Sequence, residues 1–176
     1  MEIVDDFLSE ETFDELQTFF MGNDIDWHFI PFIVYSDERE TGENKFQFEH
    51  IFYRNNAPSS AKYNILFPLL NKIRPVSMWR IKANLLTITP NNVQQDFHID
   101  VGGLSNEKLN QLTTAIFYLN TNDGYTEFQD GRIEMENTKV KSVANRFVTF
   151  PASLNHRGAS CTDEKTRVVI NFNYFK

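Results

Sequence analysis

The chain has 176 residues, of which 41% are hydrophobic and 14% aromatic, so we expect a globular domain with a sizeable core and exclude a disordered chain. Its net charge of −7 disfavours non-specific binding to nucleic acid, which depends on lysines and arginines that neutralise phosphates. The single cysteine, Cys161, leaves no disulfide within the chain. The acidic stretch at residues 1–11 is not expected to be a secretion signal, and no apolar run here approaches the length of a bilayer span. We therefore expect a soluble, cytoplasmic protein.

The first predicted element is a helix from Glu10 to Met21. Ser9 stands at the N-cap position, and Leu8 and Phe13 have the spacing of an apolar pair that packs across a helix start. Apolar residues follow one face of the helix, and Gly22 is its natural end. This apolar face predicts that the helix covers another layer of structure.

Two strands and a second helix are predicted next. Residues 27–35 and 46–53 have strand character and are joined by a polar loop. The helix is expected after Ser60, and Pro68 should kink it or shorten it. The apolar side chains of this helix are Tyr63, Leu66, Leu70 and Ile73.

From Ser77 onward the sequence predicts strand after strand, with turn signals rich in Gly, Pro, Asn and Asp between them. Many short strands at close spacing are typical of a β-sandwich or jelly roll. We expect a mainly β protein with flanking N-terminal helices, in which residues 1–176 form a single domain and residues 1–76 pack on a core of residues 77–176. The strands predicted for this core are 78–88, 97–101, 113–119, 125–128, 132–135, 147–150 and 166–175.

The last of these strands has two different faces, because side chains two residues apart point the same way. The apolar face consists of Val168, Ile170, Phe172 and Tyr174. The other face consists of Arg167, Val169, Asn171 and Asn173. An arginine and two asparagines on an inner face suit a polar cavity inside a barrel, and a solvent-facing edge strand is the alternative.

His98 and Asp100 are two residues apart and would share a face if this segment is a strand. Chance nearly explains such a pair in a chain with 4 His and 24 Asp and Glu. His156, far downstream, completes two imidazoles and one carboxylate, the facial triad that holds non-haem Fe(II) and leaves coordination positions open. His28 and His50 lie in aromatic-rich stretches and are expected to be partly buried structural residues.

Arg167 follows His156 closely enough for a return turn to bring it back beside the metal ligands. A buried guanidinium needs an anionic partner, and its fork matches a carboxylate. Next to an iron triad, this residue indicates a dicarboxylate cosubstrate. A structural salt bridge with one of the chain's many acids is the alternative.

Together these residues resemble the Fe(II)/2-oxoglutarate-dependent oxygenases, specifically the prolyl-4-hydroxylase-like branch and its small bacterial and viral members. The resemblance covers about residues 78–176. It includes the triad and Arg167 as well as a strand, a turn and a following strand. The motifs of these three segments are Tyr118-Leu119-Asn120, Gly124 and Thr126-Glu127-Phe128.

The resemblance implies a double-stranded β-helix (jelly-roll) core with Fe(II) between the two sheets, and 2-oxoglutarate and O2 as co-reactants. The residues that match the iron ligands are His98, Asp100 and His156. Arg167 matches the residue that pairs with the far carboxylate of 2-oxoglutarate, and Tyr118 matches a tyrosine whose hydroxyl also reaches this cosubstrate. Asn84 and Asn171 are further candidates for hydrogen bonds to it.

Three positions depart from the family pattern. Collagen-type hydroxylases carry a lysine where Arg167 stands, so the chain looks more like the oxygen-sensing and bacterial type. A tyrosine that is common on the strand before the first two metal ligands has no obvious counterpart here. Asn173 stands where related enzymes often carry a bulky residue.

The activity that the resemblance implies is hydroxylation of a C–H bond, coupled to decarboxylation of 2-oxoglutarate to succinate and CO2. No side chain needs to act as a general base in it. The expected substrate is a residue of a protein or peptide, proline by analogy with the family. Residues 90–97 and 102–111 are expected to rim the site, the second as a lid-like or plain surface loop.

Two other functions remain open. In the first alternative, the chain is an oxygenase that acts on a nucleobase or a free small molecule, although its acidic charge disfavours a long nucleic acid as partner. In the other it is a cupin-like metal- or ligand-binding module without turnover, which the complete set of ligands disfavours. No membrane partner is expected, and the sequence carries no signal for an oligomeric state.

Overall fold

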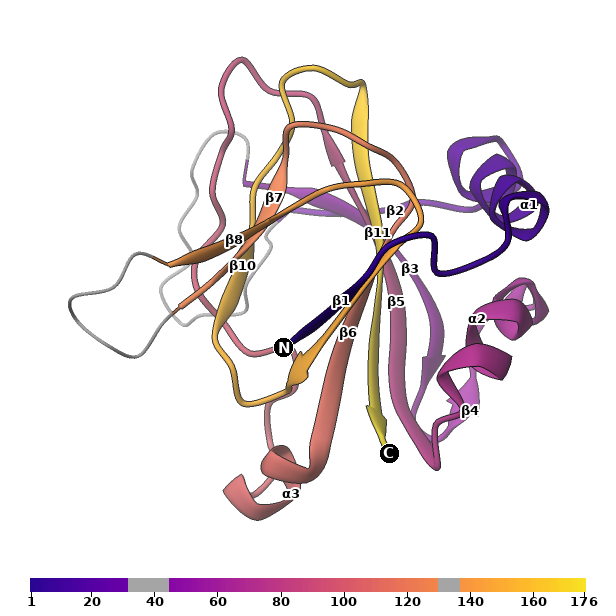
Figure 1. Ribbon diagram of the computed structural model, residues 1–176, viewed down its shortest axis with the longest axis vertical. Helices are drawn as coiled ribbons and strands as arrows, with labels where there is room; N and C mark the ends of the chain where they lie inside the picture. The colour runs from indigo at the N-terminus through magenta and orange to yellow at the C-terminus, as the bar shows by residue number, and fades with distance from the viewer. Residues whose placement is uncertain (32–44, 130–136) are drawn as a thin grey trace.

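A large antiparallel sheet runs through the centre of the computed structural model, which describes residues 1–31, 45–129 and 137–176 (Figure 1). All its neighbouring strands run antiparallel. Their order in the described residues is β1 (Glu2–Val4), β9 (Arg146–Pro151), β6 (Leu112–Tyr118), β11 (Thr166–Phe175), β5 (Ser77–Thr87), β3 (Gln47–Arg54) and β2 (His28–Ile30), with β4 (Ala57–Pro58) paired to β3.

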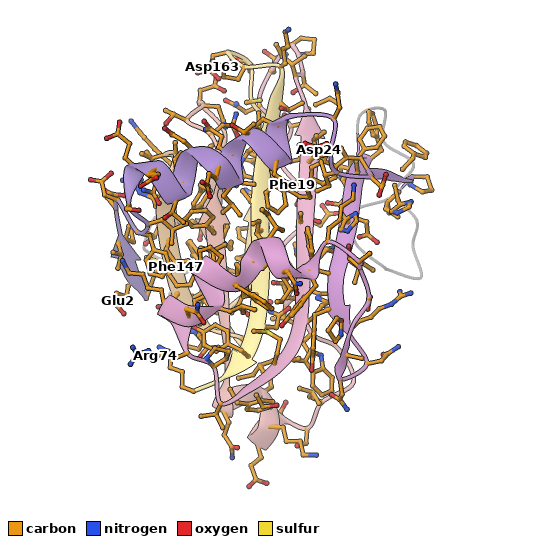
Figure 2. The ribbon with its side chains drawn as sticks, turned by 90° about the vertical axis from the view of Figure 1, so that its right-hand side faces the viewer. Glu2, Phe19, Asp24, Arg74, Phe147 and Asp163 are labelled. Carbon is orange, nitrogen blue, oxygen red and sulfur yellow. The ribbon has the colours of Figure 1, made fainter. Side chains whose placement is uncertain are left out.

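A smaller sheet lies against one face of the large sheet, and helices cover the other face (Figure 1). The smaller sheet consists of β10 (His156–Gly158), β7 (Tyr125–Phe128) and β8 (Thr138–Lys141). The helices are α1 (Glu10–Met21) and α2 (Phe67–Ile73), and Figure 2 looks onto them as they cross in front of the strands. The expected mainly β architecture with N-terminal helices is confirmed.

The main hydrophobic core fills the space between the helices and the large sheet. The core residues from α1 and β11 are Phe13, Leu16, Phe20, Val168, Ile170, Phe172 and Tyr174. On the opposite face of β11, Arg167, Asn171 and Asn173 are 4%, 8% and 0% exposed. The predicted polar inner face is therefore confirmed. The edge-strand alternative is wrong, because β11 lies between β5 and β6.

Helix α1 has the predicted bounds and the predicted N-cap residue, Ser9, which makes no side-chain cap hydrogen bond. Ser9 has the extended backbone of an N-cap residue, but its hydroxyl donates to Thr12 Oγ1 at 2.9 Å and caps no backbone N–H. Gly22 ends the helix where a side chain has no room, since a Cβ there would lie 2.6 Å from the carbonyl oxygen of Thr18. Glycine is therefore required by a close backbone approach.

The second predicted helix is divided into two parts. A 3₁₀ turn, η1 (Tyr63–Leu66), precedes α2, and Pro68 lies in the first turn of α2. The missing N–H of a proline has no intrahelical partner at that position, so it costs nothing there. Pro68 thus marks a helix start, and the predicted shortening is confirmed.

Several strand predictions differ from the structure. Residues 97–101 are not a strand, because their pairing with the described residues is one isolated bridge, between His98 and His156. Of the strand predicted at 27–35, the structure describes a pairing only for β2, and residues 32–35 lie outside the described part of the chain. The strand predicted at 132–135 also lies outside it. Strands β1, β4, β8 and β10 were missed.

The segment predicted as a rim loop, residues 102–111, contains a short helix, α3 (Asn106–Gln111). The Ser105 side chain caps it by accepting from the N–H of Lys108. Leu109 packs from it into a small apolar cluster with Val101, which anchors this side of the segment. Its second half is therefore a packed helix and not a free loop.

The two histidines expected to be structural differ from each other. His50 is 6% exposed, and its ring nitrogens lie 2.7 Å from the Asp26 carbonyl oxygen and 2.8 Å from Ser60 Oγ. This satisfied, buried histidine fits the expectation. His28 is exposed, so its predicted partial burial is wrong, because β2 is the outermost strand of the sheet. Among the described residues, no helix has the length and apolar character needed to cross a bilayer.

Candidate metal centre

Three metal-ligating side chains from distant parts of the chain converge between the two sheets. His98 Nε2 and His156 Nε2 lie 3.8 and 3.9 Å from Asp100 Oδ1. The ligand atoms of all three residues lie within 4.8 Å of one another. Reciprocal backbone hydrogen bonds of 3.0 Å between His98 and His156 bring the two imidazoles together. The predicted juxtaposition is therefore present, although residues 97–101 are irregular backbone.

Both imidazoles are oriented as metal ligands are. His98 Nδ1 lies 2.9 Å from the Asp96 carbonyl oxygen, and His156 Nδ1 lies 3.2 Å from that of Leu154. A carbonyl only accepts, so each Nδ1 carries the hydrogen and each Nε2 has a free lone pair on the side of Asp100. This outer hydrogen bond is the usual companion of a histidine ligand. Burial lowers the pKa of His156, which favours the neutral ring that a metal requires.

Asp100 is buried and held by donors from two strands of the large sheet. Arg80 reaches Oδ1 at 3.4 Å, and the amide nitrogens of Asn171 and Asn173 reach Oδ2 at 3.4 and 3.3 Å. Burial by itself raises the pKa of Asp100, but the nearby charges of His156, Arg80 and His98 outweigh it and hold the pKa well below its usual range. Asp100 is therefore an ionised, oriented carboxylate.

A cavity of about 50 Å³ opens in front of these ligands. Its walls come from β3, β5, β6, β7, β10 and β11, so both sheets contribute to it. Of the residues predicted for the site, the lining includes His98, Asp100, His156, Arg167, Asn84 and Asn171. Six of the seven predicted site residues thus face one cavity, and Tyr118 is the exception.

Arg167 is the charged residue at one end of this cavity. Its side chain donates to Ser142 Oγ at 2.8 Å and to Thr126 Oγ1 at 3.0 Å. No carboxylate of the described residues pairs with it, so the alternative of a structural salt bridge is not realised in the described part of the chain. Burial lowers the pKa of Arg167, yet a guanidinium remains protonated at neutral pH. A buried cation without an anion favours an anionic ligand here.

Tyr118 lies behind the cavity wall, and its side chain is completely buried. Its hydroxyl donates to Thr126 Oγ1 at 2.8 Å, the same atom that accepts from Arg167. Burial raises the pKa of Tyr118, so its hydroxyl stays protonated. In this arrangement Tyr118 supports Thr126 and Arg167 from behind. Its side chain is not exposed to the cavity, and its predicted contact with a cosubstrate stays a prediction.

Two asparagines leave polar atoms without a partner in the cavity wall. The Oδ1 atoms of Asn84 and Asn171 are buried and accept no hydrogen bond from the part of the chain that the structure describes. An unpaired buried carbonyl costs free energy, and a ligand or a water with an N–H or O–H would satisfy it. Asn171 also contacts Asp100, so it belongs to the metal ligand's support as much as to a cosubstrate pocket.

A close backbone approach sets the position of Arg167. A Cβ on Gly124 would lie 2.7 Å from Arg167 Cδ and 2.8 Å from Asn122 Oδ1. The turn before β7 therefore presses directly on the arginine side chain, and only glycine leaves room for it. This contact gives a physical reason for the glycine in the turn after Tyr118.

The sequence interpretation missed several residues of the site. Arg80, Lys82 and Asn84 alternate along β5, so their shared face was readable from the sequence, but only Asn84 was singled out. Thr126 and Ser142, which hold Arg167, carry no signal because hydroxyl residues are common in turns and strands. Gln47 and Gln95, two further cavity residues, also lack a recognisable pattern.

Residues 85–175 match the family model described as the 2OG-Fe(II) oxygenase superfamily. No curated protein matches the chain. Among solved structures, a prolyl hydroxylase in complex with a hypoxia inducible factor peptide fragment from Trichoplax adhaerens is similar, with a TM-score of 0.67, 12% identity, and coverage of 99% of this chain and 82% of that chain.

Two further structures share the fold. The alpha ketoglutarate dependent epimerase SnoN from nogalamycin biosynthesis has a TM-score of 0.68 and 12% identity, covering 99% of this chain and 76% of that chain. The viral collagen prolyl hydroxylase of Paramecium bursaria Chlorella virus-1 has a TM-score of 0.58 and 14% identity, covering 99% of this chain and 95% of that chain. The expected double-stranded β-helix core is confirmed. The family match extends over more than half of the chain, which therefore belongs to the 2OG-Fe(II) oxygenase superfamily, the Fe(II)- and 2-oxoglutarate-dependent dioxygenases.

Proposed function

We propose that this dioxygenase hydroxylates a C–H bond of a residue in a peptide or protein, in the manner of the prolyl-4-hydroxylase-like branch. The observation that carries the proposal is a single cavity with a His-Asp-His cluster on one side and the unpaired guanidinium of Arg167 at its end. The likeness to prolyl hydroxylases supports a peptide substrate.

In this proposal, His98, Asp100 and His156 hold Fe(II). The neutral Nε2 atoms and the ionised carboxylate are the donor set that Fe(II) of this family takes. With 2-oxoglutarate and O2, the iron supplies the oxidation of the C–H bond, while the cosubstrate leaves as succinate and CO2. The remaining catalytic task of the chain is to bind and to orient.

Arg167 binds the far carboxylate of 2-oxoglutarate. Its fork is buried, held by Ser142 and Thr126, and already desolvated, so a carboxylate gains a charge-assisted hydrogen bond at low cost in ordering. Thr126 shares this end of the cavity, and Tyr118 keeps Thr126 in place. Asn84 and Asn171 offer the unpaired oxygens that a donor on the bound molecules would satisfy.

An anaerobic titration tests the cofactor assignment. Fe(II) and 2-oxoglutarate added to the protein without O2 should produce a metal-to-ligand charge-transfer band, and admission of O2 should release succinate. Asp100→Ala should abolish iron binding, whereas Asp96→Ala, an exposed carboxylate in the same segment, should not change it. If wild-type protein with reduced iron gives neither the band nor succinate, the assignment fails.

A peptide library tests the substrate. Peptides incubated with the loaded enzyme and O2 are analysed by mass spectrometry for the gain of one oxygen atom, and the modified residue is located by fragmentation. A small molecule is the second candidate, because SnoN and the carbocyclase SnoK share the fold and act in nogalamycin biosynthesis. Succinate release stimulated by a metabolite extract, but by no peptide, would favour that second candidate.

A further inference from the structure

A second charged group lies in the wall of the cavity, on the strands that flank the triad. Lys82 of β5 and Glu49 of β3 form an ion pair of 3.2 Å, and their side chains are 15% and 17% exposed. Lys82 pairs across the sheet with Asn171, which touches Asp100, so its strand position is beside the metal ligands. Arg167 pairs with Leu86, four residues along β5, which is a separation of about 13 Å along the strand. Lys82 and Arg167 therefore serve different parts of the cavity.

The Lys82 ammonium has donors to spare. An ammonium carries three N–H groups, and Glu49 is the only acceptor paired with it among the described residues. The pair also holds Lys82 near the sheet, where burial lowers its pKa. A ligand with an anionic group can bind the remaining N–H groups without breaking the pair.

The cavity has an excess of positive charge in a chain whose net charge is −7. Among the described residues of its lining, Lys82 and Arg167 carry positive charge and Asp100 carries negative charge. Arg80 and Glu49 lie outside this lining, where Arg80 pairs with Asp100 and Glu49 pairs with Lys82, so their opposite charges cancel and the excess remains. Bound Fe(II) and the 2-oxoglutarate dianion cancel each other, so the loaded site keeps this excess. Charged groups in a partly buried site act strongly on one another because water screens them poorly. The excess therefore favours a third molecule that carries an anion.

We propose that Lys82 is a specificity-determining residue that binds a carboxylate of the substrate next to the C–H bond to be hydroxylated. On a peptide, that carboxylate is the side chain of an aspartate or glutamate near the modified residue. This inference rests on the proposed function, since it concerns the substrate of the same site. Glu49 is the ion-pair partner of Lys82 and does not itself bind the substrate.

Binding without turnover tests the proposal. The protein is loaded with Fe(II) and 2-oxoglutarate under anaerobic conditions and mixed with two randomised peptide libraries. One library contains Asp and Glu, and the other has Asn and Gln in their place. Bound peptides are quantified by mass spectrometry. One charge-assisted hydrogen bond is worth about 1.5 kcal/mol or more, so wild-type protein should retain the acidic library about tenfold better.

Four variants distinguish the effect of Lys82 on the preference for acidic peptides from a general effect of charge. Lys82→Gln should remove the preference for acidic peptides, and Lys82→Arg should keep it. Glu49→Gln should keep or strengthen the preference, because it increases the positive excess. Lys165→Gln is the matched control, since it removes one lysine charge from an exposed position outside the cavity and should leave the preference unchanged.

Small carboxylic acids and their amides, added as competitors, locate the source of the carboxylate. Displacement by a free acid but not by its amide assigns the carboxylate to a small molecule, and retention of acidic peptides against both assigns it to a peptide.

Equal retention of both libraries with no discrimination between acids and amides would overturn the proposal. So would a Lys82→Gln variant that keeps the preference, or one whose charge-transfer titration shows lost 2-oxoglutarate affinity, since Lys82 would then hold the cosubstrate. An intact wild-type band and succinate release in those cases leave the proposed function standing.

Discussion

Two arginines near the metal ligands have surroundings that differ sharply: Arg167 lines the cavity, and Arg80 lies beside Asp100 outside the lining. Arg80 is partly exposed and pairs with the Asp100 carboxylate at 3.4 Å and with Asn173 Oδ1 at 3.2 Å. Arg167 is buried, and its hydrogen-bond partners in the described residues are two hydroxyls, those of Ser142 and Thr126. A guanidinium with a carboxylate partner supports the structure around it, whereas one without such a partner is poised for an anion that arrives later. This difference in partners assigns Arg80 to the orientation of a metal ligand and Arg167 to the recognition of a cosubstrate.

The largest effect is expected at Arg167. Arg167→Met should lower the affinity for 2-oxoglutarate about a hundredfold or more, since it removes a buried charged partner of the carboxylate. The thermal midpoint of the ligand-free protein should not fall, because no protein anion is left unpaired. The charge-transfer titration measures the first quantity and calorimetry the second. Unchanged 2-oxoglutarate affinity with a lower midpoint would make Arg167 a structural residue like Arg80.

Arg80→Met should have the opposite profile. Loss of a partner that orients a metal ligand typically weakens metal binding about tenfold to a hundredfold. Iron affinity should therefore fall, while 2-oxoglutarate affinity measured at saturating iron should stay close to that of wild type. Equal losses of both would show that the two arginines act as one group.

Gly124→Ala tests the contact that sets the position of Arg167. The added Cβ would lie 2.7 Å from Arg167 Cδ, and overpacking of about 1 kcal/mol should weaken 2-oxoglutarate binding about fivefold with iron affinity unchanged. Gly102→Ala is the control, since no atom of the described residues lies within 4 Å of a Cβ there. A normal affinity for Gly124→Ala would mean that the turn gives way and Arg167 does not depend on it.

The smallest effect is expected for the stability contribution of an ion pair whose two charged groups already contact each other without a ligand. Arg157 donates to Glu127 at 2.8 Å. Burial alone raises the pKa of Glu127, but the hydrogen bonds from Arg157 and Asn137 outweigh it, so the pKa lies below the usual 4.5. A carboxyl with a lowered pKa stabilises the fold above its unfolded-state pKa and loses this contribution as pH falls through the folded-state pKa.

Chemical denaturation of wild-type protein and Glu127→Gln at about pH 7 and about pH 3.5 measures that contribution. Wild-type protein should lose more unfolding free energy on acidification than the variant, by about 1 kcal/mol or less. If the two proteins lose the same unfolding free energy on acidification, the charge of Glu127 contributes nothing to stability.

The parts of the fold that the sequence predicted are those with a strong local pattern. The alternation along residues 166–175 identified both the buried face and the cavity face of β11, and the apolar stripe of residues 10–21 identified α1. Strands of two to four residues, such as β1 and β10, are too short for an alternating pattern to stand out. The strand expected at 97–101 is absent because that segment pairs with the described residues only at one bridge, between His98 and His156.

The candidate site divides in the same way. The types of His98, Asp100 and His156 and the position of Arg167 were sufficient to predict that they meet, because few side chains hold iron or a carboxylate in this combination. The pairing of Arg80 with Asp100 depends on the register between β5 and β11 and on an irregular segment, neither of which has a local signal. For Tyr118, the family resemblance implied that its hydroxyl reaches the cosubstrate. In the structure the hydroxyl donates to Thr126, and its contact with a cosubstrate stays a prediction.

The paired backbones of His98 and His156 have a consequence for how metal is acquired. Joining two distant residues closes a long loop, and the formation of the sheets offsets the entropic cost of that closure. Both imidazoles are thus adjacent before a metal ion binds, so binding does not have to order a disordered chain. In small zinc domains, by contrast, metal binding and folding are one event. The metal-free protein should therefore keep its fold when a chelator is present, and reloading should be a fast, reversible association.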